Sequence, residues 1–409
     1  MYLANISPQN LFAFDESEII DITGLNFGTL KLAIHIDTPP QTDIFVREQI
    51  NSLFKKNLQW SGLFDFGESF DNIDLQLNIR YQPEKDIQAR IVTQDNNLLY
   101  TGIKTIQKDN NYPIAIKELV DEIIFQLTGK KSILGSAIVY ARKKRNGKYQ
   151  IVLTDLFNSR SKVLINDGRI NILPRWSPDG SSLLYTSLDS SGSRLFQFFT
   201  DKEIVVPILS MYNKISGGTW LSNNSEIVIT LAKKGNSDLY KMNLSGTKSN
   251  RLTRRSSSES NPKLSPDSSR LLFVSNRSGG IQIYQKLLKT GDTFRMTFKG
   301  NYNVEPSWSS NGEHIVFAGI KEGHFHLFLM DKEGEYVHQL THGNISAEQP
   351  VWSPNGRQIL YVSKLNYDQK LFVIRADGTY KRRLTNSPKG VSEFNPSWTT
   401  NYKWISSIK

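Results

Sequence analysis

The motif Pro-x-Trp-Ser-Pro-Asp-Gly and its variants recur six times between residues 174 and 402. The large apolar residue at the third position of the motif stands at 176, 220, 264, 308, 352 and 398. The successive intervals are 44, 44, 44, 44 and 46 residues. Periods in this range are typical of the four-stranded blades of β-propellers. The spacing therefore predicts six copies of one structural unit.

Each unit has the pattern of an antiparallel sheet. In the fifth unit, a short strand ends at Trp352, an Asn-Gly turn follows, and three further strands are predicted at Gln358–Ser363, Lys370–Arg375 and Arg382–Thr385. The Asn-Gly pair supplies the positive φ angles that tight hairpins need. Sheets of this kind bury both faces when they stack radially. The recurring tryptophan is thus predicted to pack between blades; a ring of aromatic side chains that stack on a ligand is the alternative.

The two ends of the repeat region complement each other. The last copy stops soon after its first strand, whereas three strand-like segments precede the first copy at Ala137–Arg142, Tyr149–Leu156 and Lys162–Ile165. Pairing the C-terminal strand around Pro396–Thr399 with these segments would complete a sixth blade and leave no frayed edge. We therefore expect a closed ring, which needs no second subunit to complete it, and a monomer.

The periodicity changes before residue 135. Strands are predicted at Leu30–Ile36, Asp74–Tyr81, Ala89–Thr93 and Leu98–Ile106. Helices are predicted at Thr42–Leu58, with an apolar face of Ile44, Phe45, Ile50, Leu53 and Phe54, and at Ile114–Leu127. We expect an N-terminal extension at 1–29, a small α/β domain with a mixed sheet and two helices at 30–130, and an all-β six-bladed β-propeller at 131–409.

Charge is distributed unevenly along the chain, whose formal net charge is +11. Residues 1–130 carry 11 basic and 18 acidic side chains, whereas residues 131–409 carry 39 basic and 21 acidic side chains. A basic propeller attracts acidic partners. Its basic residues are spread over the whole stretch, which argues against nucleic acid as the partner. Zero cysteines exclude disulfides and thiolate chemistry.

The repeats, and three further segments outside them, resemble the TolB family of the Tol-Pal envelope system. The sequence Asp121-Glu-Ile-Ile-Phe-Gln-Leu-Thr-Gly129 before Ala137-Ile-Val-Tyr-Ala141 is similar to the end of that family's second helix and its first propeller strand. Val46–Phe54, continuing to Phe64, is similar to its first helix and the following turn. The segment Glu18-Ile-Ile-Asp-Ile-Thr-Gly24 resembles its N-terminal extension. The resemblance covers residues from about 16 to the end. It implies a periplasmic scaffold that serves outer-membrane integrity and cell division.

The resemblance also implies two partners. The N-terminal extension of the family binds the inner-membrane protein TolA, and the loop-rich mouth of its propeller binds the outer-membrane lipoprotein Pal. The implied TolA-facing residues are Glu18, Ile19, Ile20, Asp21, Ile22 and Thr23. The implied Pal-facing residues precede the proline position of each repeat: Lys214, Gly217, Ser260, Asn261, Asn303, Glu305, Glu348, Gln349 and Asn395. The sequence departs from the pattern at Gly218, Leu264 and Asn261, where the family tends to carry proline, tryptophan and glutamate.

Catalytic motifs are missing from the sequence. It contains no Gly-x-Ser-x-Gly elbow, no His-Glu-x-x-His zinc motif, no phosphate-binding loop and no dinucleotide fingerprint. We therefore expect no enzyme and no cofactor. His324 and His326, with His338 and His342 nearby, form the best metal candidate, but solvated imidazoles on an exposed edge strand explain them more simply. Turn chemistry likewise explains Asp331–Gly334 and Asp377-Gly378 better than calcium does. We expect no metal site.

Two alternative functions remain open. One is a propeller enzyme, such as a lyase or glycan hydrolase, with carboxylates or histidines of strongly shifted pKa at the channel mouth. The other is a propeller that binds glycan or lipid through its basic face. Met1–Phe14 lacks the basic start and long apolar run of a complete secretory signal, which we interpret as a start codon placed too far downstream.

Overall fold

The computed structural model describes residues 29–66, 73–106, 112–209, 215–233, 235–246, 249–254, 256–365 and 367–403. The chain divides into two compact units, Met1–Leu134 and Gly135–Lys409. No helix in the described ranges is long and apolar enough to cross a membrane.

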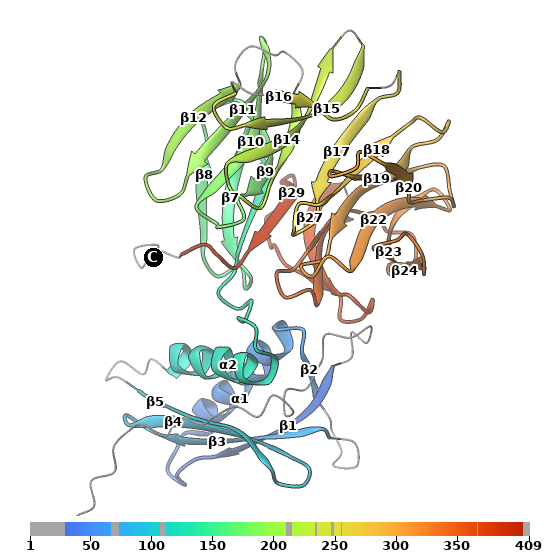
Figure 1. Ribbon diagram of the computed structural model, residues 1–409. Coiled ribbons are helices and arrows are strands. Elements are labelled where there is room, and N and C mark those ends of the chain that lie inside the picture. Colours follow the sequence, from blue (N-terminus) through green and yellow to red (C-terminus); the bar gives the residue numbers. More distant parts are fainter. Residues whose placement is uncertain are drawn as a thin grey trace, which may run out of the picture. The chain divides into compact units, whose positions relative to one another are not determined.

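The first unit is a five-stranded mixed sheet with two helices on one face (Figure 1). Its strand order is β2-β1-β3-β4-β5, and β1 runs parallel to both of its neighbours. The strands are β1 (Leu30–Asp37), β2 (Phe64–Phe66), β3 (Leu75–Gln82), β4 (Asp86–Thr93) and β5 (Leu98–Thr105). The helices are α1 (Ile44–Trp60) and α2 (Tyr112–Thr128). The predicted α/β class of this unit is confirmed, and the three-residue strand β2 is an addition to the sequence prediction.

The buried face of α1 is narrower than predicted. Ile50, Phe54 and Leu58 are buried, but Ile44 and Phe45 are 72% and 62% exposed. Both exposed residues lie in the first turn, where Asp43 caps the helix by accepting a hydrogen bond from the backbone N–H of Phe45 at 2.9 Å. The prediction that Ile44 and Phe45 share the apolar face is therefore wrong, because the buried face of α1 begins only at Ile50.

The second unit is a β-propeller of six four-stranded sheets (Figure 1). In each of five sheets the strands follow chain order from the inner to the outer edge. These blades are β9 (Ile170–Trp176), β10 (Ser182–Asp189), β11 (Gly192–Phe199), β12 (Ile204–Leu209); β13 (Ile215–Trp220), β14 (Glu226–Lys233), β15 (Asn236–Asn243), β16 (Ser249–Arg251); β17 (Glu259–Leu264), β18 (Arg270–Ser275), β19 (Gln282–Leu287), β20 (Thr293–Arg295); β21 (Asn303–Trp308), β22 (His314–Lys321), β23 (His324–Asp331), β24 (His338–Gln339); and β25 (Ala347–Trp352), β26 (Gln358–Leu365), β27 (Asp368–Arg375), β28 (Arg382–Arg383).

The sixth blade joins the two ends of the propeller. Its inner strand is the C-terminal β29 (Ser392–Thr399), which pairs with β6 (Ala137–Lys143), followed by β7 (Tyr149–Asp155) and β8 (Ser161–Ile165). Trp398 Nε1 donates a hydrogen bond to Ser136 Oγ at 2.7 Å, so residues 262 positions apart are tied together. The predicted ring closure is confirmed, and the inner strands β9, β13, β17, β21, β25 and β29 contact one another in a ring.

The motif tryptophans pack between blades, as predicted. Trp176 lies in one buried cluster with Val139 and Leu153 of the sixth blade and with Tyr185 of its own blade. Trp220 Nε1 donates to the backbone carbonyl of Arg175, on the preceding blade, at 3.2 Å. The tryptophans are 5–7% exposed. Their bulk, and in Trp220 and Trp308 also the indole N–H group, therefore connect a blade to the one before it.

In four of the six repeats a serine follows the apolar motif residue, and its hydrogen bonds explain the rest of the motif. In the third repeat, Ser265 Oγ donates to Asp267 Oδ1 at 2.5 Å and accepts from the backbone N–H of Arg270 at 2.9 Å. These bonds hold the pKa of Asp267 down to about 2, because the side-chain bond from Ser265 stabilises the ionised form. The same pair of bonds recurs at Ser177, Ser309 and Ser353. The motif is thus a hairpin turn fixed by its own side chains.

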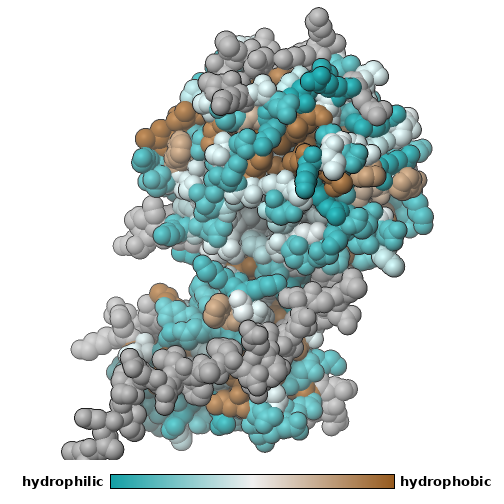
Figure 2. Space-filling model, viewed as in Figure 1, coloured by the Kyte–Doolittle hydropathy of each residue, from teal (hydrophilic) through white to brown (hydrophobic). Residues whose placement is uncertain are grey.

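The outermost strand of the first blade has an apolar surface. β12 is the longest of the outermost strands, and Ile204, Val205 and Val206 are 50%, 40% and 41% exposed. An apolar band lies over the outer strands of this blade (Figure 2). Pro207 interrupts the strand, and a proline without an N–H group limits pairing of an open edge with another chain.

Candidate partner-binding site at the channel mouth

Each inner strand carries a bulge at the residue before the proline position of its repeat. The residue there adopts a positive φ between 51° and 70° in all six blades: Leu173, Gly217, Asn261, Glu305, Gln349 and Asn395. The pairing between the inner strand and its neighbour shifts register at the same place in every blade. Bulges of this kind redirect a side chain out of the sheet. The backbone is constant around the ring, whereas the side chains differ.

These bulge residues connect consecutive blades. Glu305 Oε2 accepts a hydrogen bond from the backbone N–H of Gln349 at 2.7 Å. Gln349 Oε1 accepts from the N–H of Asn395 at 2.6 Å, and Asn395 Oδ1 accepts from the N–H of Leu173 at 3.3 Å. At Gly217 an added Cβ would lie only 3.1 Å from Leu173 Cδ1, so the leucine occupies that space. The side chains of Glu305, Gln349, Asn395 and Leu173 therefore support the bulge of the next blade.

Two carboxyl groups at this end of the inner strands have raised pKa values. Desolvation by the surrounding blades raises the pKa of Glu305 to about 7, and the nearby Glu348 contributes in the same direction. The hydrogen bond from Gln349 and the positive charges of Lys263 and Arg175 oppose that rise. Burial also raises the pKa of Glu348, against the influence of Lys364. Glu305 therefore changes its charge near neutral pH.

Two cations lie two residues beyond their bulges, at equivalent positions of β9 and β17. Burial lowers the pKa of Arg175 to about 10, with Glu305 opposing the change. Burial lowers the pKa of Lys263 well below its usual value, and the charge of Arg175 lowers it further. The channel thus holds a small cluster of opposite charges on partly buried side chains.

The structure places most of the predicted propeller residues within strands, not in loops. Gly217, Ser260, Asn261, Glu305, Glu348, Gln349 and Asn395 all lie in the first four residues of inner strands. Asn303 also begins an inner strand, but it is 4% exposed and its Nδ2 donates to Gln282 Oε1 and to the carbonyl of Lys299. Lys214 and the segment from Glu18 to Thr23 lie outside the described residues.

Sequence reasoning missed three residues of the channel. Leu173 completes the ring of bulges, and Arg175 and Lys263 bring positive charge inside it. The alignment of the six repeats contained the signal for Leu173, because it precedes Pro174 as Asn261 precedes Pro262. Nothing in the composition separated Arg175 and Lys263 from the other basic residues of the propeller.

The histidine candidates are not gathered around a metal site. No group of three or more histidine, aspartate or glutamate side chains in the described ranges could hold a metal ion. The expectation of solvated imidazoles on an edge strand is wrong for His326, which is 3% exposed on β23, a strand paired on both sides. Burial lowers its pKa, and His324 and His342 add to that effect.

The two acidic turns have the geometry of hairpins. Asp331 Oδ1 accepts backbone hydrogen bonds from Glu333 and Glu335 at 3.0 and 2.7 Å. Asp377 Oδ1 accepts from the N–H and the hydroxyl of Thr379 at 2.8 and 2.6 Å. Each carboxylate is thus bonded to its own turn.

The raised pKa of Glu305 predicts how propeller stability depends on pH. Between pH 4.5 and pH 7 the folded chain keeps a proton on Glu305 that the unfolded chain loses, so stability falls as the pH rises through this window. Glu305→Gln is expected to match the wild type at pH 5 and to be more stable at pH 8, by roughly 3 kcal/mol at most. Urea unfolding followed by tryptophan fluorescence measures the difference.

Glu322→Gln is the matched control for this measurement. Glu322 is exposed and has nearly the same backbone conformation, with a φ of 54° against 55° for Glu305. Its replacement should give the same stability difference at both pH values. Equal stabilities of Glu305→Gln and the wild type at pH 8 would contradict the assignment.

Known proteins resemble this chain over the propeller and beyond. The family model of the TolB beta propeller domain matches residues 125–402. A protein TolB homolog of Chlorobaculum tepidum is 32% identical over 259 residues, which are 56% of this chain and 57% of that protein. The Tol-Pal system protein TolB of Ruthia magnifica subsp. Calyptogena magnifica is 27% identical over 140 residues, 33% of each chain.

The solved structure of TolB from Acinetobacter baumannii has the same fold. It superposes with a TM-score of 0.75 at 19% identity, covering 91% of this chain and 96% of that one. The chain spans between a third and just over half of the length of the curated relatives it matches. Because the family model covers the whole repeat region and more than half of the sequence, the chain belongs to the TolB β-propeller family.

Proposed function

We propose that this protein is a periplasmic, non-catalytic scaffold of the Tol-Pal envelope system. One observation carries the proposal: six bulges, all with a positive φ, present five different residue types at one end of the channel of a TolB-family propeller. A rigid framework with variable side chains is suited to recognising a protein surface. The curated relative that carries the Tol-Pal name supports the same system.

The proposed partners are a Pal-like lipoprotein at the propeller and a TolA-like inner-membrane protein at the N-terminal segment from Glu18 to Thr23. On the propeller, the surface for the lipoprotein is formed by Gly217, Ser260, Asn261, Glu305, Glu348, Gln349 and Asn395. The sequence prediction adds Lys214, which lies outside the described residues. Competition or coupling between the two partners would connect the inner and outer membranes and serve outer-membrane integrity and cell division. Asn303 is left out of this surface, because its amide is bonded inside the blade.

Asn261→Gly tests the propeller surface. Asn261 is exposed and has a φ of 51°, a conformation that glycine adopts readily, so the replacement removes the side chain and keeps the bulge. We expect binding of the soluble domain of the organism's Pal-like lipoprotein to weaken roughly tenfold, as measured by calorimetry.

Asn224→Gly is the control, since Asn224 also has a positive φ of 56° but lies in a turn beyond the opposite end of its inner strand. Its binding should equal that of the wild type. A wild-type protein that does not bind the lipoprotein at all would contradict the proposal itself.

A propeller enzyme is the second candidate, and the pKa of Glu305 is the observation that favours it. A carboxyl group that titrates near pH 7 suits a general acid. Its Oε2, however, accepts the hydrogen bond from Gln349 that supports the next blade. Hydrolysis or lyase cleavage of an anionic glycan by the wild type, lost in Glu305→Gln, would favour the enzyme over the scaffold.

A further inference from the structure

The inner strands end around a cavity of about 510 Å³. Residues of all six repeats form its wall, among them all five motif tryptophans and many serine and threonine side chains. Of the described residues that line it, Arg175 is the only charged one. The bulges described above lie at the beginning of the same strands, so this cavity is at the other end of the channel.

Arg175 has no counter-ion in contact with it. Its Nη1 donates hydrogen bonds to the carbonyls of Pro174, Pro396 and Asn395 at 2.8, 3.2 and 3.4 Å. No carboxylate of the described residues lies within 4.0 Å of its guanidinium group. Arg175 is partly buried, and charges removed from water are normally paired. The guanidinium therefore carries a positive charge that the surrounding chain only partly compensates.

Lys263 adds a second positive group to the same channel. It occupies on β17 the position that Arg175 occupies on β9, two residues after the bulge. It interacts with both Arg175 and Glu305. Repulsion between the two cations helps to lower the pKa of Lys263. An anion that entered beside Arg175 would relieve this repulsion.

We propose that this cavity binds an oxyanion group, either a carboxylate or a phosphate, and that Arg175 is the residue that holds it. The remaining N–H groups of Arg175 make no hydrogen bond to the described part of the chain, and a guanidinium fork matches two oxygens of one oxyanion. Most of the lining serines already donate their hydroxyl hydrogens within the protein. Ser397 Oγ only accepts a hydrogen bond, from the backbone N–H of Trp176, so its own hydrogen can be donated to the ligand. No lining carboxylate of the described residues repels the ligand. The proposal does not depend on the Tol-Pal function.

Titration of the full-length protein with inorganic phosphate and with acetate at constant ionic strength tests the proposal. Five tryptophans line the cavity, so occupancy changes their fluorescence. We expect a saturable change with the wild type for at least one of the two anions. A short alanine peptide with a free carboxyl terminus, compared with its amidated form, distinguishes a peptide carboxylate from free phosphate as the source. No saturable change with any of these probes overturns the proposal.

Arg175→Gln is expected to weaken binding at least about tenfold, the loss typical of a charge-assisted hydrogen bond. Arg254→Gln is the control, because it removes the same charge from an exposed position of the propeller. Equal effects of the two replacements would contradict a site at Arg175, since they would indicate attraction by net charge alone.

Proton uptake provides a readout that needs no variant. An anion beside Arg175 and Lys263 raises the pKa of the nearby Glu305 above its value of about 7, so binding draws protons from the solution near neutral pH. Calorimetric titration of the wild type in two buffers with different ionisation enthalpies should show net uptake near neutral pH. Binding without proton uptake would place the anion away from this channel.

Discussion

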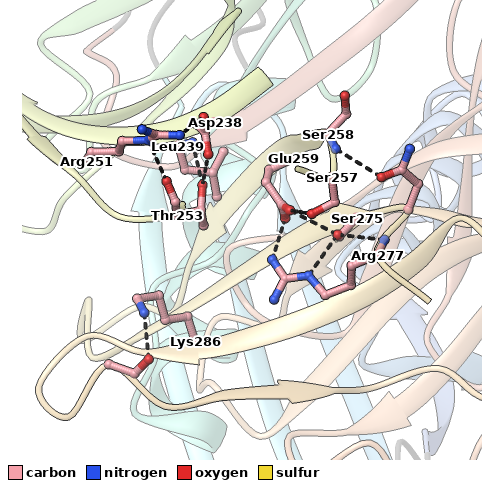
Figure 3. A network of polar contacts seen from close by, with 12 residues as sticks. Asp238, Leu239, Arg251, Thr253, Ser257, Ser258, Glu259, Ser275, Arg277 and Lys286 are labelled. Carbon is pink, nitrogen blue, oxygen red and sulfur yellow. Dashed lines mark hydrogen bonds and ion pairs between the residues drawn. The ribbon is translucent and has the colours of Figure 1, made fainter. Parts of the chain in front are cut away.

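Arg277→Met is expected to destabilise the propeller by about 3–5 kcal/mol, because it leaves a buried carboxylate without its partner. Arg277 Nη2 lies 2.8 Å from Glu259 Oε2, and the side chains are 12% and 0% exposed (Figure 3). Ser257 and Ser275 donate hydrogen bonds to Glu259 Oε1 at 2.6 and 3.1 Å. These hydroxyls remain in the variant, but neither carries a positive charge. Urea unfolding followed by tryptophan fluorescence measures the loss.

The double variant with Glu259→Leu and Arg277→Met distinguishes the energy of the ion pair itself from the contribution of the groups around it. Once both charges are removed, no unpaired ion remains in the blade, so the double variant should be more stable than Arg277→Met alone. If the stability loss of the double variant equalled the sum of the losses of the two single variants, the two side chains would not interact. The arginine also lies over the rings of Phe273 and Tyr284, at 5.1 and 4.7 Å from their centroids. The methionine keeps part of that packing.

Lys332→Met is the matched control on the surface. Lys332 Nζ lies 2.8 Å from Glu313 Oε2, a separation equal to that of the buried pair, but the two side chains are 37% and 52% exposed. Exposed pairs contribute about 1 kcal/mol or less, because water screens the charges. A loss comparable to that of Arg277→Met would indicate a general effect of removing positive charge.

The ion pair between Glu259 and Arg277 could not be predicted from the sequence. Glu259 stands in the run Ser256-Ser-Ser-Glu-Ser260, which has the composition of a solvated loop, and yet it is fully buried. Its partner comes from the turn after the next strand, 18 residues away. The pairing of β17 with β18 places Glu259 opposite Ser275 and near Arg277, and the local sequence does not indicate that a glutamate in this serine run is buried.

The architecture of the propeller, by contrast, could be predicted from the sequence repeat. The period of 44 residues, the position of Trp398 and the three strands before the first copy were sufficient to predict six blades and their closure. They did not predict the bulge before each proline, because a positive φ at Leu173, Glu305 or Gln349 is unusual for those residue types. The contacts between blades impose that conformation, so the site geometry became visible only in the structure.

Trp308→Ala is expected to cost about 3–5 kcal/mol of propeller stability. Trp308 is 7% exposed and packs with Leu272, Val274 and Met296 of the preceding blade. Its Nε1 also donates a hydrogen bond to the carbonyl of Lys263 at 3.3 Å. The alanine would leave a cavity between two rigid sheets that cannot close it. Urea unfolding of the variant, followed by far-UV circular dichroism, measures the cost without relying on tryptophan emission.

The third repeat supplies the comparison for this prediction, since Leu264 stands where the other repeats carry tryptophan. Leu264 packs at the edge of a cluster that includes Leu221 and Phe273, so a blade junction tolerates leucine when its neighbours fill the space. Trp308→Leu should therefore cost less than Trp308→Ala, about 2 kcal/mol, because it restores part of the buried apolar surface but not the hydrogen bond. Equal costs for the two variants would mean that the hydrogen bond, and not packing, makes tryptophan the preferred residue between blades.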